Sequence, residues 1–209
     1  IVLTDSNTEF AVQQEAKTAA KTNANVLEHI IKPSLKLAIV GGGIDAIPVA
    51  KIAHNLGWHV TVADPRTGYA RQAQFADAKQ IIKSSFDSIS EHAWLLNIDA
   101  IVIMTHNVTL DAQALSLAQD SSASYVGMLG PLHRTDRVLQ EAGLVSSERA
   151  TETKLEQEKS TNVLTKPLAN PIGLRLGGEL PESIALSILS EIHAFIQHAD
   201  AKSISNLLS

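Results

Sequence analysis

A glycine-rich turn between two apolar segments constrains this chain more than any other feature. Residues 35–64 read LKLAIVGGGIDAIPVAKIAHNLGWHVTVAD. We predict a strand at 35–40, a helix at 44–56 and a second strand at 58–64. Strands that are apolar at nearly every position are typical of parallel sheets covered on both faces. The order strand, glycine turn, helix and strand is that of a nucleotide-binding βαβ unit.

The glycines match a dinucleotide-binding pattern only in part. Gly41, Gly43 and Ala46 follow G-x-G-x-x-A, and Asp64 ends the next strand. In such units the glycines let the backbone approach a pyrophosphate at the helix N-terminus, and the acid binds ribose hydroxyls. The pattern therefore favours a nucleotide-like ligand. The alternative is a tight turn that only packs the helix on the strand.

Asp45 departs from this pattern, because its carboxylate would repel a pyrophosphate. One interpretation is that it stabilises the positive end of the following helix. The other is that it accepts hydrogen bonds from an amine or amide of a ligand. Both make a plain NAD site less favourable.

The rest of the chain continues the alternation of strands and helices, which predicts a doubly wound, Rossmann-like α/β fold with a parallel sheet and helices on both faces. We expect an amino-terminal remnant or extension at 1–34, the Rossmann-like domain at 35–199 and a tail at 200–209. The segment 145–166 is polar and is predicted to be a surface excursion. Further predicted strands are 26–33, 80–83, 99–105 and 124–130, and further predicted helical segments are 67–75, 88–96, 108–119, 132–142 and 181–198.

Polar residues follow several of these strands, and the carboxyl ends of parallel strands share the edge where ligands bind. His106 follows the strand 99–105, although it could instead cap the next helix or be simply exposed. Gly130 ends a strand, and Arg134 suits a phosphate or carboxylate but could also be an ordinary surface arginine. Glu179 could face the same crevice or serve only as an acid at a helix start. We predict no metal site, because His106 and the nearby Asp111 are too few ligands.

Composition excludes several classes of protein. The chain has 17 basic and 22 acidic side chains, so it offers no basic surface for nucleic acid. No apolar run is long enough to cross a membrane. Cysteine is absent, which excludes disulfides and thiolate chemistry within this segment. Nothing resembles a secretory signal, and we expect a cytoplasmic protein. Because the sequence begins with Ile1, we expect a fragment of a longer protein.

Four segments, in this order, carry a resemblance to a known family. They are GGGIDAIPVAKIAHNLGWHVTVADPR, IVIMTHNVTLDAQAL, YVGMLGPLHRTDRVL and NPIGLRLGGELPESIALSILSEI. Together they resemble the xanthine dehydrogenase accessory factor family, also called the XdhC/CoxI family, over residues 26–144 and 167–196. The TH and PIGL segments are more specific than the glycine turn.

The resemblance implies a Rossmann-like carboxyl-terminal domain behind a smaller amino-terminal domain. It implies a chaperone that binds the molybdenum cofactor (molybdopterin type) and delivers it to a molybdenum hydroxylase such as xanthine dehydrogenase. We expect no turnover by this domain, and a homodimer is plausible. The family's glycine-rich motif with a cysteine is missing here. The residues predicted to bind the cofactor are Gly41, Gly42, Gly43, Asp45, Asp64, His106, Gly130, Arg134 and Glu179.

Our hypothesis for Asp45 is that its carboxylate prefers the N–H donors of a pterin to a bare pyrophosphate. Two other functions stay open. A nicotinamide (NAD(P))-dependent oxidoreductase could use His106 as a proton donor, but the chain leaves little room for a substrate domain. A regulatory module that senses a nucleotide is the second alternative.

Overall fold

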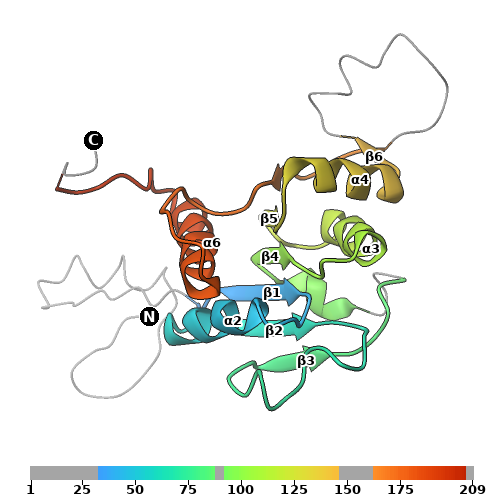
Figure 1. Ribbon diagram of the computed structural model, residues 1–209, viewed down its shortest axis with the longest axis horizontal. Helices are drawn as coiled ribbons and strands as arrows, with labels where there is room; N and C mark the ends of the chain where they lie inside the picture. Colours follow the sequence, from blue (N-terminus) through green and yellow to red (C-terminus); the bar gives the residue numbers. More distant parts are fainter. Residues whose placement is uncertain (1–32, 88–91, 146–161, 206–209) are drawn as a thin grey trace, which may run out of the picture. The chain divides into compact units, whose positions relative to one another are not determined.

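The centre of the protein is a parallel six-stranded sheet. The computed structural model describes residues 33–87, 92–145 and 162–205. The described helices and strands all lie within residues 35–209 (Figure 1). The strand order is β3-β2-β1-β4-β5-β8, with every neighbouring pair parallel. This order confirms the predicted Rossmann-like α/β fold. The strands are β1 Lys36–Val40, β2 His59–Ala63, β3 Gln80–Ile82, β4 Ala100–Ile103, β5 Tyr125–Met128 and β8 Leu168–Ala169.

Helices cover both faces of the sheet (Figure 1). On one face lie α2 (Ala46–Asn55) and α6 (Pro181–Gln197), and on the other lie α3 (Val108–Gln119) and α4 (Leu132–Ala142). Successive side chains of a strand point to opposite faces. In β1, Leu37 and Ile39 therefore join the core under α2 and α6, while Ala38 and Val40 join the core under α3 and α4.

The ends of the helices follow local sequence signals. Pro48 lies in the first turn of α2, where its missing N–H costs no intrahelical hydrogen bond. Pro181 is the first residue of α6, a position that suits its fixed φ. Gly143 ends α4 with a φ of 66°, the left-handed conformation that glycine adopts without strain. These positions agree with the predicted helix bounds within a few residues.

Some predicted elements differ from the structure. The helix predicted near 67–75 is wrong, because this segment forms consecutive turns whose Ala70 N–H bonds to Gly42 O instead of to a helical partner. The helical turn predicted near 88–96 is a 3₁₀ helix, η2, at Ala93–Asn97, and residues 88–91 lie outside the described residues. The strand predicted at 26–33 and most of the excursion at 145–166 also lie outside them.

Three very short strands were not predicted. One is β8, and the other two, β6 (Leu144–Val145) and β7 (Asn162–Val163), pair with each other in a separate two-stranded sheet. Two residues are too few to show an alternation of apolar and polar side chains, so only pairing reveals them. None of the described helices is long and apolar enough to cross a membrane.

Candidate functional site

The candidate site lies where the strand order reverses. From β1 the chain moves outward to β2 and β3, and then returns to the other side of β1 with β4. Val40 at the end of β1 pairs with Ile103 at the end of β4. The turn after β1 and the loop after β4 therefore meet at the carboxyl edge of the sheet. In open α/β sheets this switch point is where ligands bind.

Two of the three turn glycines allow a close approach of backbone segments. Gly41 has a φ of 119°, and a Cβ there would lie 2.5 Å from the carbonyl carbon of Met104. A Cβ on Gly42 would overlap the backbone of Ala70 at less than 3.0 Å. A Cβ on Gly43 would meet nothing closer than Tyr69 Cε1, at 3.9 Å. Gly41 and Gly42 are thus required by packing, whereas Gly43 leaves space beside the start of α2.

Asp45 and His106 face each other across the switch point. The Nε2 atom of His106 lies 3.2 Å from Oδ2 of Asp45, and the side chains are 51% and 41% exposed. Asp45 occupies the N-cap position of α2 but makes no side-chain hydrogen bond to the helix. His106 has a φ of 58°, in the left-handed region that side chains rarely adopt. The loop backbone therefore holds the imidazole beside Asp45 at some conformational cost.

Asp64 lies at the end of β2 but is fully buried. Its Oδ2 accepts hydrogen bonds from Gly42 N–H at 2.8 Å and from Arg66 Nη2 at 2.8 Å. Its Oδ1 accepts from the backbone N–H of Arg66 at 3.0 Å and from Arg66 Nε at 2.9 Å. Burial alone would raise the pKa of Asp64, but the hydrogen bonds from Arg66 and Gly42 outweigh it and hold that pKa below its usual value. The carboxylate is therefore ionised and bonded within the chain.

The residues after Asp64 form a segment, 66–70, that we call the strap. The Arg66 guanidinium also donates from Nη2 to Thr105 O at 3.1 Å, which joins the strap to the loop after β4. Its carbon lies 3.6 Å from the centre of the Tyr69 ring, in a cation–π contact. Ala70 N–H donates to Gly42 O at 3.0 Å. The strap thus closes over the glycine turn on the β2 side.

A second buried carboxylate organises the loops after β4 and β5. Asp111 in α3 is fully buried, and its Oδ1 accepts from Thr105 N–H at 3.1 Å and from Thr105 Oγ1. Arg134 pairs with Asp111 Oδ2 through Nη2 and donates from Nη1 to Leu129 O at 3.2 Å. Gly130 has a φ of 138° and packs against the Arg134 side chain. These contacts hold the guanidinium of Arg134 within the protein.

Glu179 stands apart from these groups. It is exposed in the loop between β8 and α6, a loop tied down by a hydrogen bond from Gly173 N–H to Glu191 and one from Ser187 Oγ to Leu174 O. Within the described ranges, no hydrogen bond or ion pair joins Glu179 to the glycine turn. The structure thus brings Asp45 and His106 together, and it joins Gly42 directly to Asp64.

Sequence reasoning missed Arg66 and the structural task of Asp111. The signal for Arg66 was its position two residues after Asp64 in the segment ADPR. At this spacing the arginine guanidinium can bond to the aspartate carboxylate. Asp111 was considered only beside His106, as one of too few ligands for a metal ion. Its bond to Arg134 joins residues 23 positions apart, and no local pattern predicts such a pair.

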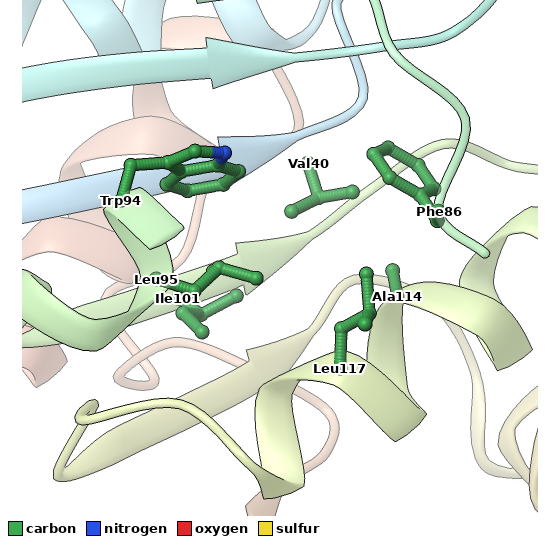
Figure 2. Close-up of a pocket in the computed structure, with 7 residues that line it drawn as sticks. All are labelled: Val40, Phe86, Trp94, Leu95, Ile101, Ala114 and Leu117. Carbon is green, nitrogen blue, oxygen red and sulfur yellow. The ribbon is translucent and has the colours of Figure 1, made fainter. Parts of the chain in front are cut away.

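Cavities elsewhere in the described residues do not match this site. A gap on the α3 face of the sheet has a volume of about 10 Å³, roughly the space of one water molecule. Figure 2 shows the residues that line it. Only apolar and aromatic side chains surround it, so it is a packing gap. Its lining residues are Val40, Phe86, Trp94, Leu95, Ile101, Ala114 and Leu117. Across the described part of the chain, no group of three or more His, Asp or Glu side chains could hold a metal ion.

Comparisons with known proteins agree on one family. Residues 37–192 match the XdhC Rossmann domain family. The chain is 28% identical over 168 residues to a Bacillus subtilis (strain 168) protein described as a probable subunit of xanthine dehydrogenase, covering 80% of this chain and 45% of that protein. The crystal structure of a xanthine dehydrogenase from Bacillus halodurans is similar with a TM-score of 0.67 and 26% identity, covering 96% of this chain and 55% of that one. The chain thus spans about half the length of these relatives.

Proposed function

The chain belongs to the XdhC Rossmann domain family, and from this premise we propose that it is the cofactor-binding part of a maturation factor for a molybdenum hydroxylase such as xanthine dehydrogenase. Its ligand is the molybdenum cofactor of the molybdopterin type, and its task is to hold this cofactor and deliver it to the apoenzyme. The Asp45–His106 pair at the switch point is the observation that carries the proposal.

The residues at the switch point fit the pterin part of such a cofactor. A pterin presents N–H donors, and the half-exposed carboxylate of Asp45 accepts hydrogen bonds. The same negative charge opposes a pyrophosphate on the first turn of α2. The N–H groups of Gly43 and Ile44 donate to no residue in the described part of the chain, so they stay available to a ligand. Together, the acceptor carboxylate of Asp45 and these two N–H donors suit a flat heterocycle that carries both N–H groups and acceptor atoms, as a pterin does.

Each residue at the edge then has a distinct task. The cofactor supplies the molybdenum-dithiolene chemistry that its client enzyme needs. Asp45 binds and orients the ring through its carboxylate. His106 would hold the Asp45 carboxylate in place through its Nε2. Arg134 and Asp111 do not touch the ligand directly but fix Thr105 and Leu129, which border the site.

Anaerobic titration of the full chain with purified molybdenum cofactor tests binding. We expect a rise in the midpoint of thermal unfolding and a saturable binding curve. Asp45→Asn keeps the shape of the side chain but replaces an acceptor oxygen by a donor, and we expect affinity to fall by about tenfold, since a hydrogen bond to a charged group contributes about 1.5 kcal/mol. Asp77→Asn is the matched control, because Asp77 is an exposed aspartate in the loop before β3.

The titration has two outcomes that would contradict the proposal. A thermal shift with NAD⁺ and none with the molybdenum cofactor would favour an oxidoreductase. Equal affinities of Asp45→Asn and the native chain would exclude Asp45 from binding.

Delivery is tested by incubating the loaded chain with an apo molybdenum hydroxylase and measuring recovered activity. The free cofactor at the same concentration is the reference.

A further inference from the structure

The strap occupies the side of the glycine turn that faces β2. Ala70 N–H bonds to Gly42 O at 3.0 Å, and the Ala70 backbone lies so close that Gly42 could carry no Cβ. The Tyr69 ring extends toward Gly43, where a Cβ would be 3.9 Å from Tyr69 Cε1. The side of the glycine turn nearest β2 is therefore covered by the strap residues Tyr69 and Ala70.

A dinucleotide needs this same surface. In Rossmann units the pyrophosphate passes over the glycine turn, and the acid at the end of the second strand binds the ribose hydroxyls of the adenosine. Here the acid is Asp64, whose side chain is 0% exposed and whose oxygens accept from Gly42 and Arg66. The Arg66 guanidinium thus takes up the acceptor positions that ribose hydroxyls would use.

The other half of the switch point is open. Asp45 and His106 are about half exposed, and no strap residue makes a hydrogen bond to either side chain. We propose that the strap is a built-in specificity element: Arg66 and Tyr69 fill the adenosine half of a Rossmann site, so that the open half takes a ligand that ends at the glycine turn and carries no nucleoside toward β2.

The contacts of the strap explain why it stays closed. The Arg66 guanidinium donates from Nε and Nη2 to the two oxygens of Asp64. This bidentate geometry fixes the orientation of the guanidinium, and the opposite charge of the carboxylate attracts it. Nη2 also reaches Thr105 O, and the Tyr69 ring stacks on the guanidinium. Opening the strap would leave a buried carboxylate with only the Gly42 N–H, which is unfavourable in a low-dielectric environment. A competing ribose offers neutral hydroxyls in place of this charged partner.

The ligand class follows from the open half. The identity of the ligand, a pterin phosphate, rests on the proposed function. The strap proposal adds that no nucleoside extends from this ligand across Gly42. The exclusion of nucleotides does not depend on that identity. The two can therefore fail separately, since binding of ADP tests the strap and binding of the molybdenum cofactor tests the function.

Isothermal titration of the full chain with ADP and with NAD⁺ tests the strap. The native chain and Thr67→Ala should bind neither probe measurably at millimolar concentration. Thr67 is the matched control, because it is an exposed strap residue whose side chain makes no hydrogen bond among the described residues. Combining Arg66→Ala with Tyr69→Ala removes the guanidinium and the aromatic ring and so exposes the Asp64 carboxylate. We expect ADP affinity to rise by at least about tenfold, with amide shifts at Gly42 and Asp64.

A stable fold of the double variant is checked by circular dichroism. If it does not fold, Arg66→Lys combined with Tyr69→Ala keeps a positive charge near Asp64 but loses the bidentate geometry, and the same gain is expected. Micromolar binding of ADP or NAD⁺ by the native chain overturns the proposal. So does a folded variant that gains no affinity.

Discussion

The Nε2 atom of His106 lies 3.2 Å from Oδ2 of Asp45, and this contact joins the turn after β1 to the loop after β4. Both side chains are about half exposed, and such pairs contribute at most about 1 kcal/mol to stability. The left-handed backbone of His106 costs on the order of 1 kcal/mol or more. The pair therefore adds little net stability, which agrees with a binding task at this position.

Replacing His106 by glycine should not destabilise the protein. Glycine adopts a φ of 58° without strain, so we expect the free energy of unfolding of His106→Gly to stay the same or to rise by about 0.5–1 kcal/mol. His106→Val, with a branched Cβ, should lose about 1 kcal/mol or more. Urea unfolding measures both. A loss of more than about 1 kcal/mol in His106→Gly would show that the imidazole is needed for folding.

Arg134→Ala should destabilise the protein strongly, because it removes the cation beside the fully buried carboxylate of Asp111. Breaking one partner of a buried pair typically costs about 3 kcal/mol. Arg137→Ala is the matched control, since Arg137 is exposed on the same helix, and its effect should stay within about 0.5 kcal/mol. Similar denaturation midpoints for the two variants would mean that Arg134 is free to serve a ligand.

Gly42→Ala and Gly43→Ala separate the two parts of the glycine turn. The added methyl group at Gly42 would overlap the Ala70 backbone, so the strap must move, and we expect a loss of about 2 kcal/mol or more. At Gly43 the nearest atom is 3.9 Å away, and the change should stay within about 0.5 kcal/mol. Hydrogen exchange at the Ala70 amide should become faster in Gly42→Ala alone. Equal exchange in both variants would argue against the strap contact.

The sequence was sufficient to predict five of the six strands of the sheet and the edge where the candidate residues Asp45 and His106 meet. Continuous apolar runs predicted β1, β2 and β4, and the glycine turn fixed where α2 begins. Asp45 and His106 could be placed near each other without a structure, because the carboxyl ends of parallel strands share one edge. Only their direct contact was new.

The strap was beyond sequence reasoning for a physical reason. Consecutive turns have no period, so residues 66–70 looked like a weak helix. The contact between Ala70 and Gly42 depends on a chain reversal that no local preference dictates. Asp64 shows the consequence: its position at the end of β2 was predicted well, yet its bonding to Arg66 changes what its carboxylate can bind.

Stability should fall in acid because of Asp64. Its pKa is held below the usual value, so its contribution is present above the unfolded-state pKa of about 3.9 and is lost as pH falls through the lower folded-state pKa. Asp64→Asn should lower the free energy of unfolding at pH 7 by about 2 kcal/mol or more, since the amide cannot accept all four hydrogen bonds. Urea unfolding between pH 7 and about pH 2.5 should show the two curves converging in acid. Asp77→Asn, the exposed control, should follow the native curve throughout. A constant gap between Asp64→Asn and the native chain across this range would mean that the Asp64 carboxylate is not preferentially ionised in the folded protein.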